Sequence, residues 1–284
     1  MSVIYLDNNA TTQVAQEVLE AMLPYFREFY GNPSSMHTFG GQVGQKIRTA
    51  REQVAKLIGA MPEEIIFTSC GTESDNSAIR SALATQPDKK HIITSRVEHP
   101  AVRALCAHLA TQGYRITELP VDKNGILDLE NLEKSMTPDT AVVSLMWGNN
   151  ETGVIFPVEA AAAMAHEKGI LFHTDAVQAA GKIPIDLKKN AIDMLSISGH
   201  KLHAPKGVGV LYIRRGTKYS PFLIGGHQEK ERRGGTENSP SIIGLGKACE
   251  LAAKNMDKEN SKVKKLRDKP VSYTHLTLPT KRIV

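Results

Sequence analysis

The sequence has few cysteines, few aromatic residues and no long apolar run. Its three cysteines, Cys70, Cys106 and Cys249, are too few and too widely spaced for a disulfide framework or a zinc knuckle, so we expect a reducing, cytoplasmic location. No window approaches about eighteen consecutive apolar residues. The start, MSVIYLDNNATT, lacks the basic and apolar regions of a secretory signal. We therefore expect no membrane partner and no secretion.

The charge balance also lacks a strong excess of either sign. Lys and Arg number 35 and Asp and Glu number 30, which gives a formal net charge of +5. The two signs are mixed along the chain, and no basic stripe is interleaved with aromatic residues, so nucleic acid is not an expected partner. A hydrophobic fraction of 41% over 284 residues is typical of a globular protein with a sizeable buried core.

Short apolar runs rich in β-branched residues alternate with helical patterns over most of the chain. In one helical pattern the apolar residues recur at spacings of four and three, at Val43, Ile47, Ala50, Val54 and Leu57. This alternation predicts an α/β fold with a mostly parallel sheet. The runs that we expect to be buried strands are 63–69, 91–95, 141–147, 170–175, 193–198 and 208–213.

Two further helices carry signals at their ends. Pro157 lies in the first turn of one, which stops at Gly169. The other begins at Ser239, with Pro240 at its first helical position, and continues as a charged helix to about residue 269.

The last residues differ from the rest of the chain. From residue 271 the sequence VSYTHLTLPTKRIV is polar and β-branched, without a helical period and without an evident partner strand. VSYTHLTLPT resembles one reading frame through a widely used sequencing adaptor. We therefore interpret 271–284 as a non-native tail and leave it out of the fold; a genuine C-terminal strand is the alternative.

One lysine, Lys201 in SISGHKLHAPKGVG, admits two interpretations. Most lysines in loops are solvated charges. Asp175, however, ends an apolar strand in HTDAVQ, where an acid is costly unless it meets a cation. A pyridinium nitrogen is such a cation. An aspartate and a lysine at two strand ends are the pair that a pyridoxal phosphate site needs, because the lysine forms the Schiff base and the acid keeps the ring protonated.

The phosphate of such a cofactor requires hydrogen-bond donors. FTSCGTESDNSAI supplies a strand, a turn at Gly71 and Thr72, and a helix whose free N–H groups would face an anion. Ser198 and His200 directly precede the lysine and add a hydroxyl and an imidazole. The sequence therefore predicts a phosphate-binding turn close to Lys201.

Other polar residues are ambiguous when taken singly. His99 in VEHPA and Asn150 in WGNNETG have structural interpretations as well as functional ones, since a single histidine is more often structural. His200 and His203 in HKLH have the spacing of metal ligands, but no acidic or thiol ligand accompanies them. We expect no metal.

Eight blocks occur together in order: YLDNNATT, GNPSSMH, FTSCGTESDN, EHPAV, NNETG, HTDAVQ, SGHKLHAPKGVG and RRGGTEN. With them the chain resembles the cysteine desulfurases, class V aminotransferases of the fold-type I pyridoxal phosphate group, over residues 2–269. FTSCGTESD and HAPKGVG resemble the nitrogen-fixation, NifS-like branch more than the housekeeping branch. The resemblance implies an aspartate-aminotransferase-like large domain and a smaller C-terminal domain.

The resemblance also implies a role for each matching residue. Lys201 is the Schiff-base lysine, Asp175 the acid on the pyridine nitrogen, and Gln178 the donor to the phenolic oxygen of the ring. His99 stacks on the ring and takes part in acid–base steps, and Asn150 lies near the ring and the substrate. The implied phosphate cup comprises Gly71, Thr72, Ser198, Gly199, His200 and, from the partner subunit of a homodimer, Thr236.

The implied reaction converts L-cysteine to L-alanine and leaves the sulfur as an enzyme persulfide for an iron–sulfur scaffold or another acceptor. In the family, the nucleophilic cysteine and the arginine that binds the substrate carboxylate belong to the small domain, which we expect to be truncated here. The expected organisation is an N-terminal segment at 1–15, the large domain at 16–255, and the start of the small domain at 256–270.

None of the three cysteines is an evident substitute for that nucleophile. Cys70 is interpreted as a packed residue beside the phosphate turn, and Cys106 and Cys249 as core residues on apolar helical faces. We therefore expect the chain as given to be inactive. The alternatives are a selenocysteine lyase, another class V aminotransferase, or a non-catalytic binding module with the same fold.

Overall fold

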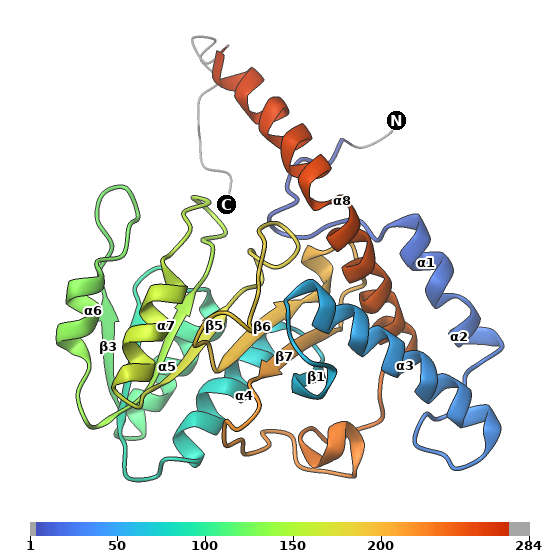
Figure 1. The fold of residues 1–284 in the computed structure, drawn as a ribbon, viewed down its shortest axis with the longest axis horizontal. Helices are drawn as coiled ribbons and strands as arrows, with labels where there is room; N and C mark the ends of the chain where they lie inside the picture. Colours follow the sequence, from blue (N-terminus) through green and yellow to red (C-terminus); the bar gives the residue numbers. More distant parts are fainter. Residues whose placement is uncertain (1–3, 273–284) are drawn as a thin grey trace.

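A seven-stranded sheet crosses the centre of the computed structural model, which describes residues 4–272 (Figure 1). All pairs from β6 to β3 are parallel, whereas β7 is antiparallel to both of its neighbours. The predicted α/β fold with a mostly parallel sheet is therefore confirmed, with one reversed strand. In sheet order the strands are β1 (Ile65–Thr68), β7 (Gly209–Ile213), β6 (Met194–Ser198), β5 (Leu171–Asp175), β4 (Thr140–Met146), β2 (His91–Ser95) and β3 (Arg115–Leu119).

All six predicted strands form, each within two residues of its expected ends. The sequence analysis missed β3, whose sequence is RITEL and in which Arg115 and Glu118 are exposed. As an edge strand it pairs with β2 alone. Because such a strand is only partly covered, it needs no continuous apolar run, which was the signal that revealed the others.

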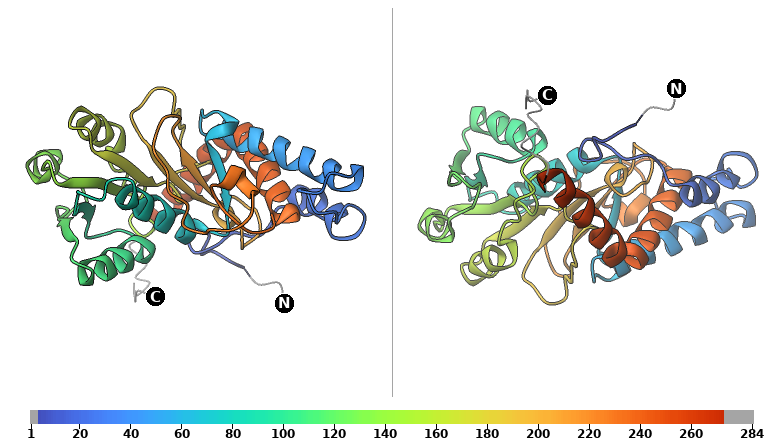
Figure 2. Two further views of the ribbon diagram at one scale, coloured as in Figure 1. Left: turned by 90° about the horizontal axis from the view of Figure 1, so that it is seen from below. Right: turned by 90° about the horizontal axis from the view of Figure 1, so that it is seen from above.

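Helices cover both faces of the sheet (Figures 1 and 2). The helices expected at α3, α7 and α8 are confirmed. Within residues 4–272 none of the helices is both long and apolar enough to cross a membrane. The helices are α1 (Gln16–Met22), α2 (Pro24–Arg27), α3 (Thr38–Leu57), α4 (Gly71–Ala84), α5 (Pro100–Thr111), α6 (Leu129–Ser135), α7 (Val158–Glu167) and α8 (Ser239–Ser272).

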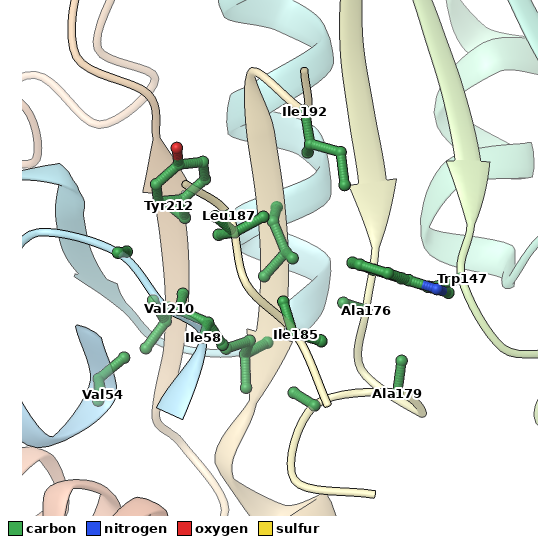
Figure 3. Packing of buried hydrophobic residues seen from close by; sticks show 14 of the residues in the cluster. Val54, Ile58, Trp147, Ala176, Ala179, Ile185, Leu187, Ile192, Val210 and Tyr212 are labelled. Carbon is green, nitrogen blue, oxygen red and sulfur yellow. The ribbon is translucent and has the colours of Figure 1, made fainter. Parts of the chain in front are cut away.

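The alternation of side chains along the strands divides the core between the two faces. On β7, Val210 and Tyr212 belong to the cluster that α3, α7 and α8 cover, while Leu211 and Ile213 belong to the cluster beneath α4 and α5. Figure 3 shows the first cluster, with Tyr212 close to Leu187. A period of two residues places neighbouring side chains on opposite faces, so both faces of β7 are apolar.

The long helix α8 begins on the body of the protein and then extends beyond it (Figure 1). Its first turns approach α3 closely, since a Cβ at Gly246 would lie 2.5 Å from Cα of Ala50. Farther along, Val263 is 59% exposed. The helix continues through residue 256, where we expected the small domain to start, and that boundary stays a prediction. The expected non-native tail lies outside the described residues from 273 onward.

Candidate active site

The carboxyl ends of the parallel strands meet at one edge of the sheet, and a cavity of about 800 Å³ lies there. Ligands of open α/β sheets bind at this edge. The loops that follow β2, β4, β5 and β6 therefore lie close together at this edge. Nine of the eleven predicted site residues line the cavity: Gly71, Thr72, His99, Asn150, Asp175, Gln178, Ser198, His200 and Lys201.

The other two predicted residues lie off the cavity wall. Gly199 is buried in the turn before Lys201, where its N–H donates to the carbonyl of Val208 at 2.9 Å. A Cβ at Gly199 would lie 2.8 Å from Cγ1 of Val208, so the residue allows the turn to pack closely. Thr236 is exposed in the loop before α8. A role in which it reaches the site of a partner subunit stays a prediction.

Lys201 lies in a single 3₁₀ turn directly after β6. Its Nζ donates to the carbonyl oxygens of Asn9 and Ala10 in the N-terminal segment. Burial lowers the pKa of this amine from its usual value, and the carboxylates of Asp7 and Asp175 act in the opposite direction. A lowered pKa increases the fraction of neutral amine, which is the nucleophilic form.

Asp175 ends β5 at the floor of the cavity and is 6% exposed. Its Oδ1 accepts the N–H of Val177 at 2.9 Å. Burial raises the pKa of the carboxyl, whereas that hydrogen bond and the charges of His99 and Lys201 lower it. Desolvation disfavours the ionised acid, so a cation that enters the cavity beside it would be stabilised by the charge pair.

Two buried acids that the sequence analysis did not single out lie close to Asp175. Asp75 on α4 is 1% exposed and lines the cavity, and its Oδ1 lies 3.6 Å from Nε2 of His173. Glu98 is 4% exposed and accepts the N–H of Met146 at 3.0 Å. In sequence, TESD is typical of a helix start and VEHP of a loop. Only the packing of α4 over β5 and β6 brings these acids together.

Burial raises the pKa of both acids, and the nearby Asp175 adds to the effect. For Glu98 the pKa rises to about 8. One oxygen of each, Oδ1 of Asp75 and Oε2 of Glu98, has no hydrogen-bond partner within residues 4–272. A buried carboxyl oxygen without a partner is less costly when the group is neutral, so burial favours the protonated form of both acids.

We expect a Glu98→Gln variant to lose part of the pH dependence of stability. The folded pKa of about 8 lies above the ordinary value of 4.5, so the unfolded chain releases this proton first and stability falls as pH rises between these values. The neutral, isosteric glutamine removes that contribution. Thermal denaturation from pH 5 to pH 8 measures it, with the exposed Glu17→Gln as control. Unchanged slopes in Glu98→Gln would contradict the prediction.

The ring nitrogens of His99 and the amide of Gln178 have defined orientations. His99 caps α5, and its Nδ1 accepts the N–H of Ala101 at 3.1 Å; in the neutral ring the proton is therefore on Nε2. Gln178 donates from Nε2 to the carbonyl of Asn9 at 3.0 Å, and its Oε1 accepts from Lys182 Nζ at 2.6 Å. Both side chains thus present donors on the cavity side.

The phosphate end of the cavity is formed by the start of α4. A Cβ at Gly71 would lie 2.9 Å from Cγ2 of Val177 and 3.4 Å from Cβ of Ser198, so only glycine brings this helix end against the turns after β5 and β6. The first N–H groups of a helix have no intrahelical partner and carry partial positive charge. With the hydroxyl of Ser198 and the imidazole of His200, they form an anion-binding end.

These groups fit pyridoxal phosphate. Lys201 supplies an amine for the aldehyde, Asp175 a buried acid for the ring nitrogen, Gln178 an amide for the ring oxygen, and α4 an anion site for the phosphate. Together, the mostly parallel sheet and this donor set define a fold-type I pyridoxal phosphate enzyme.

The chain belongs to the aminotransferase class-V family, whose model matches residues 4–278. Cysteine desulfurase 1 of Trichormus variabilis is 61% identical over 269 residues, which cover 95% of this chain and 67% of the relative. The cysteine desulfurase NifS of Azotobacter vinelandii is 61% identical over 270 residues, with the same two coverages, 95% and 67%. The chain thus spans about two thirds of the length of these relatives.

Solved structures give the same result. A structure described as a NifS-like protein superposes on this chain with a TM-score of 0.93 at 44% identity. The superposition covers 95% of this chain and 75% of the chain of that structure. SspA in complex with cysteine superposes with a TM-score of 0.85 at 40% identity, and this superposition covers 87% of this chain and 72% of the SspA chain. The resemblance to the cysteine desulfurases, with a NifS among them, is confirmed, and the family uses pyridoxal phosphate.

Proposed function

We propose that this chain is the cofactor-binding part of a cysteine desulfurase, which converts L-cysteine to L-alanine and passes the sulfur to an enzyme thiol as a persulfide. The observation that carries the proposal is the convergence of Lys201, Asp175 and Gln178 on one cavity whose far end is the N-terminus of α4. The cysteine complex of SspA, at 40% identity, supports the substrate.

Each residue then has a task that follows from its chemistry. Bound pyridoxal phosphate supplies an electron sink when the Cα proton of cysteine leaves. The carboxylate of Asp175 would hold a proton on the ring nitrogen, and the free amine of Lys201 would take the Cα proton of the substrate. His99 and Asn150 line the cavity; the imidazole of His99 would stack on the ring and take part in acid–base steps, and Asn150 would lie near the ring and the substrate.

The N-terminal segment helps to hold these groups in place. Thr12 donates from its backbone N–H and from Oγ1 to the carbonyl of His200, at 2.9 Å and 2.8 Å. Asn9, three residues earlier, lies against Lys201 and Gln178. Residues 7–12 thereby cover one side of the cavity and limit the access of water to the amine.

The two core cysteines of the chain do not suit the role of sulfur acceptor. Cys106 and Cys249 are fully buried in the two core clusters, and burial raises the pKa of each thiol to about 12. A thiol, unlike a thiolate, is a poor nucleophile. Cys70 is the N-cap of α4 at the phosphate end of the cavity. We therefore propose that this chain by itself binds cofactor and substrate without turnover.

The remaining proposals concern partners and location. Thr236, exposed before α8, reaches the phosphate of a second copy in a homodimer. The sulfur goes to an iron–sulfur scaffold or another acceptor, and the protein acts in the cytoplasm, where thiols stay reduced. Sedimentation of the chain with and without pyridoxal phosphate tests the homodimer.

The proposed function is tested by adding pyridoxal phosphate to the purified chain. We expect a visible absorbance band, which L-cysteine changes, and a borohydride-reduced adduct that peptide mapping assigns to Lys201. With L-cysteine and a thiol reductant we expect sulfide at the level of a buffer blank. Absence of the band would refute the cofactor assignment, and rapid sulfide release would refute the proposal that the chain does not turn over.

A further inference from the structure

Lys182 is a partly buried amine that contacts the cavity-lining Gln178, and none of the roles above is assigned to it. It follows Gln178 by four residues, and its Nζ donates to Gln178 Oε1 at 2.6 Å. Burial, together with the charge of Lys201, lowers its pKa to about 8. A lysine that gives up hydration for one short contact has a defined position.

The backbone around Lys182 is fixed from two directions. Its carbonyl accepts from Nδ2 of Asn260 on α8 at 2.7 Å, and its N–H donates to the carbonyl of Ala179 at 3.0 Å. Gly181, directly before it, adopts φ +72° and packs against Leu202. The ammonium therefore approaches Gln178 from a rigid turn rather than from a freely moving surface chain.

Two contacts decide which way the Gln178 amide points: the ammonium of Lys182 at Oε1 and the carbonyl of Asn9 at Nε2. A carboxamide has an acceptor and a donor end of nearly equal shape, and only its neighbours distinguish the two orientations. An ammonium group has three donors and no acceptor, so it requires Oε1 on its own side. The donor Nε2 must then face the opposite side, where it now meets the carbonyl of Asn9.

We propose that Lys182 is a positioning residue that fixes the Gln178 amide with its N–H₂ group toward the phenolic oxygen of bound pyridoxal phosphate. The inference deepens the proposed function and rests on it, because the cofactor oxygen is the partner of Gln178. A charge-assisted bond at Oε1 also polarises the amide and strengthens its donor end. Lys182 thus acts on the cofactor through Gln178, without touching it.

The test is the pH midpoint of the visible absorbance of the Lys201-bound cofactor. In Lys182→Met only the carbonyl of Asn9 still orients the amide, and the charge that strengthens its donor end is gone. The ring oxygen then becomes more basic, and we expect the midpoint to rise by about one unit. The surrounding charged groups, Lys201, Asp175, Asp7 and His99, are present in every variant. Lys182→Arg, which keeps a donor and a charge, is expected to restore most of the wild-type midpoint.

Two comparisons separate positioning from a structural effect. Lys189→Met removes an exposed lysine seven residues on, and is expected to leave the midpoint unchanged. In a Gln178→Ala background, Lys182→Met is expected to add no further shift. The melting temperature of each cofactor-free variant shows whether it folds.

The possible results are distinct. A midpoint that Lys182→Met leaves at the wild-type value, or a full shift that persists in the Gln178→Ala background, overturns the role of Lys182 alone. A wild-type chain without any visible band overturns the proposed function, and the role of Lys182 with it. If Lys182→Met fails to fold, the Lys182→Gln variant decides: with no charge to hold Oε1, it is expected to shift the midpoint in the same direction.

Discussion

Replacement of Lys201 by alanine is expected to abolish the borohydride-trapped adduct of pyridoxal phosphate entirely. The amine of Lys201 lines the cavity at the end of β6, and burial has already lowered its pKa, so the aldehyde reacts with this group. The phosphate end remains intact in the variant, and we expect weaker, non-covalent binding to persist. Mass spectrometry after reduction, together with equilibrium dialysis, separates the two contributions.

The matched control is Lys206→Ala, in the same turn. Lys206 is exposed and does not line the cavity, so its loss is expected to leave the trapped adduct at the wild-type level. Exchange of the substrate Cα proton in D₂O, followed by NMR, gives a second readout. It is expected to fall by about 100-fold or more in Lys201→Ala, because the proton acceptor is gone. Full adduct formation in Lys201→Ala would contradict the assignment of this lysine.

Replacement of Asp175 by asparagine is expected to have two opposite effects. Exchange of the substrate Cα proton falls by about 100-fold or more, since a neutral amide no longer holds a proton on the ring nitrogen. The cofactor-free chain, by contrast, gains about 1 kcal/mol or more of unfolding free energy at neutral pH. The pKa of Asp175 is raised by burial, so stability is lost as pH rises through that pKa, and asparagine removes this loss.

Both effects can be measured on one preparation. Asn keeps the oxygen that accepts the N–H of Val177, so the turn after β5 is expected to stay in place. Urea denaturation at pH 5 and pH 8 gives the stability, and the gain is expected to be larger at the higher pH. Asp88→Asn serves as control, because this acid is exposed and does not line the cavity. A variant that is less stable at pH 8 would show that the carboxylate stabilises the fold.

The strands beside the site could be predicted because they are buried on both faces. In the run 193–198, Met194, Leu195 and Ile197 alternate with small polar residues, and the buried strand that they form carries Lys201 to the sheet edge. The turn at Gly71 could also be predicted, since a glycine before a helix start is a local signal. In contrast, β3 was missed because it is only partly buried: Arg115 and Glu118 are exposed, and the strand has no continuous apolar run.

The sequence by itself determined the chemistry of this protein: a lysine, an acid and a phosphate turn, each marked by the strand or helix next to it. Tertiary structure alone decided which other charges surround them. Asp75, Glu98 and Lys182 lie far apart from one another along the chain. Their pKa values and their roles depend on burial and on hydrogen-bond partners, such as Gln178 Oε1 at 2.6 Å from Nζ of Lys182. Desolvation and hydrogen-bond direction depend on the groups that surround a side chain. The order of residues along the chain does not show which groups these are.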